Sequence, residues 1–294
     1  MVVQTKGRRV VVRDAEGERV CFLSGQRAVV GDRVQWVEAR GEGGKLMGVD
    51  PRDTALERVD FNGRTQVLAA NVGGLLVVTS PNEPPFRPGL VDRYMVAGRA
   101  LGLDVAVVLN KVDQGVSDEV DAALALRAAH GIEVFRTQAT TADGVAEVQA
   151  FLGEVSADRP WVLVGHSGVG KTSLMAALLP EEEVGAVGEI SAHWGTGQHT
   201  TTYTRLFGVP GGGQLVDSPG IRTFSPAGID SATARDHFPG VGRLGCHYRD
   251  CLHRPGEEGC VAEEEVPEAL LVSYRRLLSE VLEREDRVRQ RERR

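Results

Sequence analysis

The sequence contains no apolar run long enough to cross a lipid bilayer as a helix, and its N-terminus carries no secretory segment. It also lacks an excess of positive charge, because 34 Lys and Arg residues face 41 Asp and Glu residues and leave a formal net charge of −7. These absences argue against a membrane protein and against a protein that binds nucleic acid over its whole surface. We expect a soluble, cytoplasmic monomer in which any RNA contact comes from local basic patches.

A chain of 294 residues with 41% hydrophobic content is long enough for two or three domains, each with its own core. Short alternating segments separated by Gly and Asp turns occur near the N-terminus, at residues 8–13, 18–23, 28–37 and 45–49. This pattern predicts a small five-stranded barrel of the OB type, a fold that commonly binds nucleic acid. The predicted first strand is basic, through Lys6, Arg8, Arg9 and Arg13; an RNA contact and a solvated sheet face explain this charge equally well.

The strongest motif is a Gly-x4-Gly-Lys-Thr loop between a predicted apolar strand, residues 161–164, and a predicted helix, residues 172–179. In such a loop the backbone N–H groups surround phosphates at a helix N-terminus. Lys171 would reach the outer phosphates, and the Thr172 hydroxyl would bind Mg²⁺. The predicted phosphate-binding residues are Gly165, His166, Ser167, Gly168, Val169, Gly170, Lys171, Thr172 and Ser173.

A second motif, Asn110-Lys111-Val112-Asp113, follows a predicted strand at residues 105–109. The Asp113 carboxylate can accept hydrogen bonds from the guanine N1–H and amino groups, whereas adenine would leave it unpaired. This base-reading motif precedes the phosphate loop, which is the reverse of the order in an ordinary GTPase. Because these loops line one edge of one sheet, a circular permutation leaves the site intact.

A third motif begins with Asp217, after a predicted strand at residues 214–216, and ends with Gly220. In phosphate-loop enzymes such an aspartate holds Mg²⁺ through water, and the glycine N–H senses the γ-phosphate. Upstream, Thr201 is expected to complete the Mg²⁺ shell and His199 to orient the attacking water, although a solvent-exposed loop explains both residues as well. Ile221 stands where Ras-like proteins place a water-orienting glutamine, so we expect slow intrinsic hydrolysis.

Three of the four cysteines and one histidine form a cluster: Cys246, Cys251, His253 and Cys260. The spacing predicts one closed, structural zinc site, with a disulfide as the competing interpretation. The fourth cysteine, Cys21, is interpreted as a small buried side chain. A helix from near Pro267 carries an apolar face and then an arginine-rich tail, which either contacts RNA or is solvated; the apolar face consists of Leu271, Tyr274, Leu278 and Val281.

These motifs in this order resemble those of the ribosome small-subunit-dependent GTPase A family (RsgA, also called YjeQ), whose members are circularly permuted GTPases. Further matches are Val30-Gly31-Asp32-Arg33-Val34 in the barrel, Ala69-Ala70-Asn71-Val72 after it, and Gly188-Glu189-Ile190-Ser191 before the switch. The resemblance implies an OB-fold barrel at residues 1–62, a circularly permuted α/β P-loop GTPase domain at 63–224 and a mainly helical zinc-binding domain at 225–294.

The resemblance also implies hydrolysis of GTP to GDP and phosphate, stimulated by the small ribosomal subunit during its late maturation, with release of the factor on hydrolysis. The barrel and the zinc domain would contact ribosomal RNA. The family's second base-binding loop corresponds to Gln138 and Ala139, with Gln138 in place of the usual serine, and Gln198 replaces an arginine before the switch histidine. A GTP-regulated RNA-binding assembly chaperone, in which turnover is incidental, is the alternative; Asp113 disfavours an ATP-using enzyme.

Overall fold

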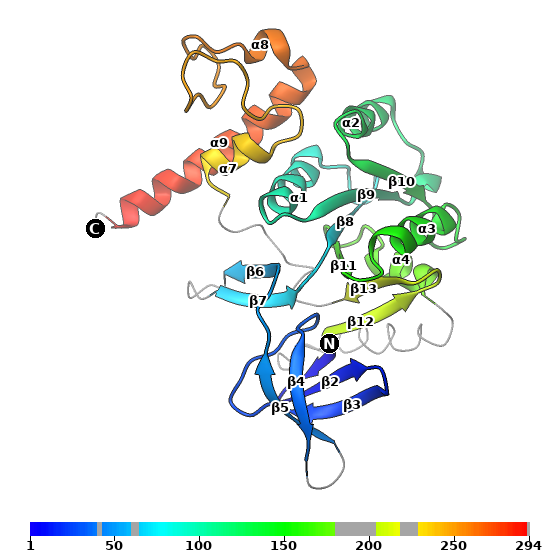
Figure 1. Ribbon diagram of the computed structural model, residues 1–294. Coiled ribbons are helices and arrows are strands. Elements are labelled where there is room, and N and C mark those ends of the chain that lie inside the picture. The colour runs from blue at the N-terminus through cyan, green and yellow to red at the C-terminus, as the bar shows by residue number, and fades with distance from the viewer. Residues whose placement is uncertain (40–42, 60–64, 180–203, 218–228, 293–294) are drawn as a thin grey trace.

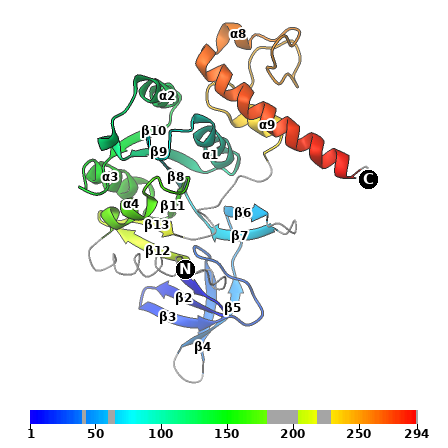
Figure 2. The ribbon, with the colours of Figure 1, turned by 180° about the vertical axis from the view of Figure 1, so that it is seen from behind.

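A computed structural model describes residues 1–39, 43–59, 65–179, 204–217 and 229–292 (Figure 1). Eleven strands form one continuous sheet with the order β10-β9-β8-β11-β13-β12-β1-β2-β3-β5-β4, and β6 and β7 form a separate hairpin. The barrel lies at one end of the molecule and the C-terminal helices lie at the other, with the α/β region between them (Figures 1 and 2). In the described part of the chain, no helix combines the length and the apolar character needed to span a membrane.

The central region is an α/β unit. Its strands are β8 (Gly74–Thr79), β9 (Asp104–Asn110), β10 (Glu133–Thr137), β11 (Trp161–Val164), β12 (Thr204–Val209) and β13 (Gly213–Asp217). Its helices are α1 (Pro88–Ala100), α2 (Asp118–Ala128), α3 (Val145–Val155) and α4 (Lys171–Leu178), with the short 3-10 helix η1 (Val112–Gln114). The strands predicted at residues 105–109, 161–164 and 214–216 are confirmed to within one residue at each end.

The strand order of this unit records the permutation. The chain enters the sheet at β8, runs outward through β9 to β10, and then returns to β11, which pairs with the other side of β8. All of these strands and β13 are parallel, so their C-terminal ends lie at one edge, and β12 is antiparallel to β13. The β8 side chains are buried throughout because helices cover both faces of a parallel sheet. The predicted permuted GTPase fold is therefore confirmed.

The N-terminal barrel has the OB-fold strand order β1-β2-β3-β5-β4, with β3 parallel to β5. Its strands are β1 (Val2–Lys6), β2 (Arg9–Asp14), β3 (Gly17–Phe22), β4 (Val34–Glu38) and β5 (Gly44–Val49). Cys21 is fully buried among Val10, Val12 and Leu46, as predicted for a small apolar side chain.

Two details of the predicted barrel are wrong. The strand expected at residues 28–37 begins only at Val34, because Asp32 accepts a hydrogen bond from Val29 N (2.8 Å) and Gly31 takes a positive φ of 90°. These contacts form a turn, which interrupts the expected strand before Val34. The basic residues also do not share a strand, since Lys6 ends β1, Arg8 lies in the turn, and Arg9 and Arg13 belong to β2.

Motif residues of the barrel form its joint with the α/β unit. A Cβ atom on Gly31 would lie 1.9 Å from the carbonyl oxygen of Ala70, so only glycine fits there. Asn71 donates from Nδ2 to the Gly31 carbonyl oxygen (2.9 Å) and accepts from the backbone of Asp53 (2.8 Å). In addition, β1 pairs with β12 in antiparallel register, which joins the barrel to the α/β unit in one continuous sheet. The hairpin of β6 (Ala55–Val59) and β7 (Thr65–Ala70) connects the barrel to the α/β unit along the chain.

The expected domain boundaries at residues 62 and 224 fall outside the described residues and stay predictions.

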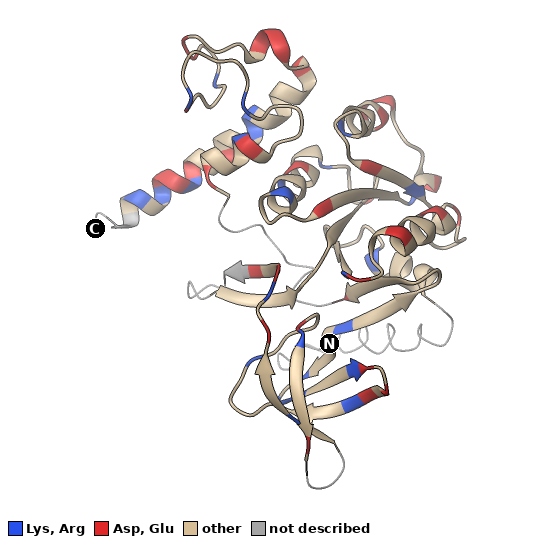
Figure 3. Ribbon diagram, viewed as in Figure 1, with Lys and Arg blue, Asp and Glu red and all other residues tan. Residues whose placement is uncertain are grey.

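The C-terminal region consists of α7 (Ser231–His237), α8 (Ala262–Glu265), α9 (Glu268–Glu292) and the loop between α7 and α8. The predicted apolar face of α9 is buried, with Tyr274 fully enclosed. Acidic and basic residues alternate along the rest of α9 (Figure 3). This charged part is not frayed at its start, because Glu285 accepts a hydrogen bond from Ser231 N (2.7 Å) and Arg284 donates to the Ile229 carbonyl oxygen.

Candidate nucleotide and metal sites

The phosphate loop joins β11 to α4 at the C-terminal edge of the sheet. Its glycines have backbone angles that other residues rarely adopt, with φ of 140° at Gly165, 87° at Gly168 and 91° at Gly170. Space is equally restrictive, because a Cβ atom on Gly165 would lie 2.2 Å from the Val78 carbonyl oxygen and one on Gly170 would lie 2.3 Å from Asn110 Nδ2. Glycine is therefore required at these positions.

Lys171 lies inside the curve of this loop. Its ammonium group donates to the carbonyl oxygens of Gly165 (2.8 Å) and His166 (2.5 Å), and only 9% of the residue is exposed. By contrast, His166, Ser167 and Gly168 are exposed to solvent. An exposed glycine-rich backbone in front of a buried cation at a helix N-terminus is suited to bind phosphate groups.

Asn110 connects three loops of the site. Its Nδ2 donates to the Val169 carbonyl oxygen (3.0 Å), and its Oδ1 accepts from Thr137 Oγ1 and from the backbone of Ala139, both at 3.1 Å. Asn110 is 2% exposed, so these bonds are shielded from water. The structure thus brings the base-reading motif, the phosphate loop and the predicted second base-binding loop at Gln138 and Ala139 together around one amide.

The rest of the base-reading motif turns outward. Lys111 has a left-handed backbone, with φ of 65°, and begins η1, which carries Val112 and Asp113. Asp113 is exposed, and its carboxylate has no hydrogen-bond or ion-pair partner within the described ranges. A free carboxylate at the end of a parallel strand is available to a guanine base.

The segment at residues 82–84 braces both loops, although no sequence motif predicts this role. Lys111 Nζ donates to the Glu83 carbonyl oxygen (2.8 Å), and Asn82 Nδ2 donates to the Gln114 carbonyl oxygen (2.8 Å). On the other side, a Cβ atom on Gly168 would contact Pro84 Cδ at 3.4 Å. The available signal was the Pro84-Pro85 pair just after the β8 strand, because β8 ends at the same edge as β9 and β11.

Two of the three oxygen donors predicted for Mg²⁺, Thr172 and Asp217, lie at this edge. Asp217 ends β13, is 6% exposed, and lies one strand away from the phosphate loop. Thr172 is half-buried in the first turn of α4, and Ser173 beside it is exposed. A carboxylate and a hydroxyl are ligands that Mg²⁺ accepts together with nucleotide phosphates, so the residues fit the ion. Gln198, His199, Thr201, Gly220 and Ile221 lie outside the described residues.

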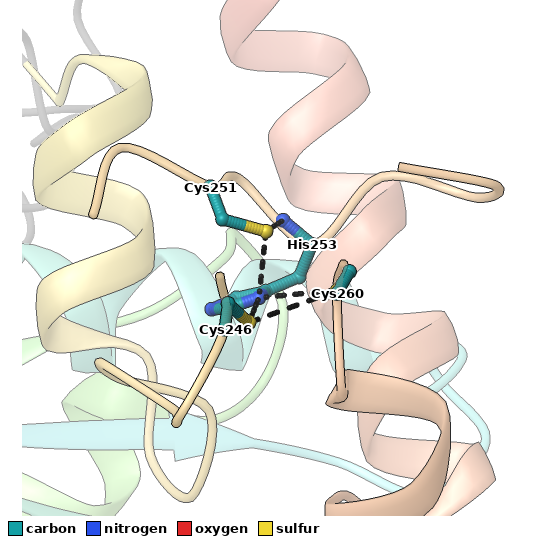
Figure 4. Close-up of side chains that lie close together, drawn as sticks. All are labelled: Cys246, Cys251, His253 and Cys260. Carbon is teal, nitrogen blue, oxygen red and sulfur yellow. Dashed lines mark hydrogen bonds between the residues drawn. The ribbon is translucent and has the colours of Figure 1, made fainter. Parts of the chain in front are cut away.

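The predicted zinc ligands converge in the loop between α7 and α8 (Figure 4). The His253 Nδ1 atom lies 3.4 Å from Cys246 Sγ and 3.5 Å from both Cys251 Sγ and Cys260 Sγ, and the sulfurs of Cys246 and Cys260 are 4.0 Å apart. Tetrahedral Zn²⁺ places S and N ligands about 3.5 Å apart and two S ligands about 3.8 Å apart. All four ligand atoms lie within 4.8 Å of one another. The cluster therefore fits one zinc ion.

Neighbouring groups orient these ligands. His253 Nε2 lies 3.0 Å from the Gly242 carbonyl oxygen and donates to it when Nδ1 is unprotonated, which directs the Nδ1 lone pair at the three sulfurs. Burial raises the pKa of the Cys251 thiol to about 12, a cost that a bound metal offsets by favouring the thiolate. The disulfide interpretation is wrong, because all four cysteines are free and a disulfide needs sulfurs about 2 Å apart.

Known proteins match the chain along most of its length. A family model described as RsgA GTPase matches residues 49–227. A protein from Pseudomonas fluorescens is 36% identical in an alignment that covers 95% of this chain and 84% of that protein. A protein from Azotobacter vinelandii is 37% identical in an alignment that covers 97% of this chain and 86% of that protein. Both are named small ribosomal subunit biogenesis GTPase RsgA.

Two crystal structures have a similar fold. The structure of YjeQ from Thermotoga maritima is similar with a TM-score of 0.74 and 25% sequence identity, over 96% of this chain and 97% of that one. The structure of YloQ, described as a circularly permuted GTPase, has a TM-score of 0.69 over 96% of this chain and 94% of that one. At 20% identity, the second comparison supports the fold alone.

Proposed function

The chain belongs to the RsgA family of circularly permuted GTPases, and from this premise we propose that it hydrolyses GTP in the late maturation of the small (30S) ribosomal subunit. The subunit stimulates hydrolysis, and the factor leaves the subunit once GDP and phosphate have formed. The observation that carries the proposal is the Asn110 network, which places a guanine-reading motif against a phosphate loop in a permuted sheet.

Guanine recognition falls to Asp113 and to the backbone of the loop at Gln138 and Ala139. Asp113 is exposed and free to accept two hydrogen bonds from the base, and the Asn110 amide holds the Ala139 backbone beside the same strand end. Lys111 and Val112 would contact the base between Asp113 and the loop at Gln138 and Ala139. A base without an N1–H and amino pair would leave the Asp113 carboxylate unpaired, which selects GTP over ATP.

Phosphate binding falls to the loop from Gly165 to Ser173. Lys171 exchanges its loop carbonyl partners for the outer phosphate oxygens, and backbone N–H groups of the loop donate to the remaining oxygens. Thr172, Thr201 and, through water, Asp217 would hold Mg²⁺, which neutralises negative charge on the β- and γ-phosphates when bound. Gly220 would donate its N–H to the γ-phosphate.

The water-positioning group is proposed from the sequence alone. His199 is the candidate, because an imidazole can accept a proton near neutral pH and Ile221 cannot orient water. A site that lacks the glutamine found in Ras-like proteins needs a partner to complete it. This requirement gives a physical reason for stimulation by the ribosomal subunit.

The two flanking regions are proposed to contact ribosomal RNA. The OB-fold barrel has a suitable architecture, and the C-terminal region would hold one structural Zn²⁺ through Cys246, Cys251, His253 and Cys260. A bound zinc ion would cross-link the four ligands of this loop, which has little hydrophobic core of its own. We propose that the protein acts as a monomer in the cytoplasm, where small subunits mature.

The deciding experiment compares the GTPase rate of the purified protein with and without small ribosomal subunits. We expect a large increase in turnover with small subunits and none with large subunits. GTP binding without any change in turnover would favour the alternative, a GTP-regulated rRNA-binding assembly chaperone. Failure to bind guanine nucleotides at all would contradict both functions.

A further inference from the structure

The outer surface of the barrel carries a group of exposed hydrophobic side chains. Of the nine large hydrophobic side chains that are exposed in the described residues, four lie on β3, β4 and β5: Val20, Phe22, Val37 and Met47. Their strand neighbours Cys21 and Leu46 are buried in the barrel core, so the exposed side chains point outward. This surface lies at the end of the molecule away from the C-terminal helices (Figure 1). Hydrophobic side chains gathered on one face of a barrel indicate a binding surface.

The strand register aligns one residue from each of the five barrel strands in a single row. Arg9 of β2 pairs with Phe22 of β3, and Phe22 pairs with Lys45 of β5. Lys6 of β1 extends the row beyond Arg9, and Val37 of β4 extends it beyond Lys45. We call these five residues the outer row, and all of them are exposed. Because paired residues point to the same face of a sheet, the outer row places an aromatic ring between two cations.

Phe22 and Arg9 form a planar pair within the outer row. The Arg9 guanidinium carbon lies 5.0 Å from the centre of the Phe22 ring, and Phe22 is 43% exposed. Unpaired bases of RNA stack on aromatic rings and on guanidinium planes. The pair therefore offers two surfaces on which a base can stack.

The cations of the outer row are available to phosphate groups. Lys6, Arg9 and Lys45 form no hydrogen bond and no ion pair through their side chains within the described part of the chain. By contrast, Arg33 of the same barrel pairs with Asp53 at 2.9 Å. A phosphate that binds to the outer row therefore displaces no carboxylate.

The charge of the barrel favours RNA over a protein as the partner of the outer row. Residues 1–59 contain 11 Lys and Arg against 9 Asp and Glu, whereas the whole chain contains 34 against 41. The barrel is thus the cationic end of an acidic chain, and it attracts a phosphate chain more strongly than the rest of the surface does. OB-folds commonly bind oligonucleotides on the face of their second and third strands, where Arg9 and Phe22 lie.

We propose that the outer row binds a single-stranded segment of RNA, in which unpaired bases stack on Phe22 and Arg9 while Lys6 and Lys45 bind the flanking phosphates. The inference rests on the proposed contact of the barrel with ribosomal RNA and deepens it, because it names the face of the barrel and the form of the RNA. A paired helix keeps its bases stacked on one another and cannot offer them to Phe22, so the outer row selects unpaired RNA.

The first test is Phe22→Leu in the full-length protein, since leucine keeps an apolar side chain but has no plane for stacking. The probe is a fluorescein-labelled RNA of about 12 nucleotides and mixed sequence, within the site size of OB-folds, used single-stranded and annealed to its complement. We expect the wild type to bind the single strand more tightly than the duplex. In Phe22→Leu the dissociation constant of the single strand should rise roughly 5- to 50-fold, because base stacking is lost.

The matched control is Leu101→Ala, which removes a hydrophobic side chain of similar exposure, 40%, from the α/β unit. This variant should bind the single strand like the wild type. Three outcomes overturn the inference: no binding of the single strand by the wild type, equal binding of single strand and duplex, or an unchanged dissociation constant in Phe22→Leu. The first of these would assign the outer row to a protein partner.

The second test measures the phosphate contacts through the salt dependence of binding. The logarithm of the affinity for a single strand falls linearly with the logarithm of the salt concentration, with a slope of about 0.7 for each phosphate that the protein neutralises. We expect Lys45→Gln to reduce the slope by about 0.7 and Phe22→Leu to leave it unchanged. Arg33→Gln is the control, because Arg33 already has a carboxylate partner and should keep the wild-type slope. A wild-type slope in Lys45→Gln would refute the phosphate contact.

The proposed function fails in a different measurement. A wild type whose GTPase rate does not respond to small subunits contradicts that function, whatever its affinity for the oligonucleotide. A wild type that is stimulated by small subunits, beside a Phe22→Leu variant that binds the single strand normally, removes only the role of the outer row. Both Phe22→Leu and Lys45→Gln change exposed side chains far from the nucleotide site, so their melting temperatures and GDP affinities should match the wild type.

Discussion

Asn110 Nδ2 and the Val169 carbonyl oxygen form a buried 3.0 Å hydrogen bond across 59 residues of sequence. This bond fixes the base-reading motif against the phosphate loop in space, whatever order the two have along the chain. The permutation therefore changes connectivity without changing the relative placement of the two halves of the nucleotide site.

Asn110→Ala removes this bond and the two bonds that Asn110 Oδ1 accepts. We expect guanine-nucleotide affinity to fall by about 30- to 100-fold, since three buried hydrogen bonds of about 1 kcal/mol each are lost and only partly replaced by water. Titration with a fluorescent GDP analogue measures the effect. Gln26→Ala, which removes an exposed side-chain bond to the Met47 carbonyl oxygen in the barrel, is the control and should change affinity little.

Asp113→Asn replaces the proposed guanine acceptor by a group that also donates. GTP binding should weaken, and xanthosine triphosphate, which offers an acceptor in place of the amino group, should become the preferred nucleotide. Competition between the two nucleotides for the variant provides the measurement. A variant that keeps the wild-type preference would refute the role assigned to Asp113.

Cys251→Ser tests the metal centre. We expect about one zinc per chain in the wild type and close to none in the variant, with a lower melting temperature for the C-terminal region, because zinc binding contributes directly to folding. Metal analysis of the purified proteins gives the result. The control is Cys21→Ala, a buried cysteine of the barrel that lies outside the cluster and should keep the full metal content.

Arg127→Met breaks the ion pair with Asp92. This pair is buried, since the Arg127 side chain is 1% exposed and the Asp92 side chain is 0% exposed. We expect a loss of about 3–5 kcal/mol in the free energy of unfolding, because the carboxylate is left buried without a cation. The exposed pair of Arg136 and Asp121 is the control, and Arg136→Met should cost less than about 1 kcal/mol. Urea unfolding of both variants tests the difference.

The stability of the Arg127→Met variant should also depend on pH. Burial already raises the pKa of Asp92, and Arg127 opposes this shift, so removing Arg127 raises the pKa further. A folded-state pKa above that of the unfolded chain means that the folded form binds the extra proton, and stability falls as pH rises through the folded pKa. The free energy of unfolding of Arg127→Met should therefore lie further below that of the wild type at about pH 8 than at about pH 6.

Gly31→Ala tests the joint between the barrel and the α/β unit. Both Gly31 and Gly25 have positive φ, at 90° and 83°, but a Cβ atom on Gly31 meets Ala70 O at 1.9 Å whereas one on Gly25 meets nothing within 4 Å. Gly25→Ala should cost about 1 kcal/mol from backbone strain, and Gly31→Ala about 3 kcal/mol or more. Similar melting temperatures for the two variants would contradict a crowded joint.

The sequence predicted those parts of the site in which a motif has a fixed geometry. The strand before Gly165, the helix that begins at Lys171 and the cluster around His253 follow from local spacing, because phosphate and zinc binding each demand one arrangement of nearby residues. The base-reading motif was placed for the same reason. These elements need no knowledge of distant contacts.

Other features depend on tertiary contacts that spacing does not encode. The strand expected at residues 28–37 was lost to a turn held by the Asp32 side chain, although its apolar pattern looks like a strand. The Glu83 carbonyl oxygen accepts a hydrogen bond from Lys111, 28 residues away, and the pairing of Gln4 with Arg205 joins the barrel to the α/β unit. Buried polar residues such as Asp92 appear in sequence as an ordinary surface charge on a helix.

The pairing of β1 with β12 also protects the molecule from self-association. β12 is the last strand of the α/β unit on that side, and an unpaired strand there would present a row of free backbone N–H and C=O groups. The barrel covers the start of this row, at Thr204 and Arg205, with its own first strand. Cutting the barrel away would therefore leave an adhesive edge and favour aggregation, so the barrel acts as a solubility element for the nucleotide-binding unit in addition to any partner that it binds.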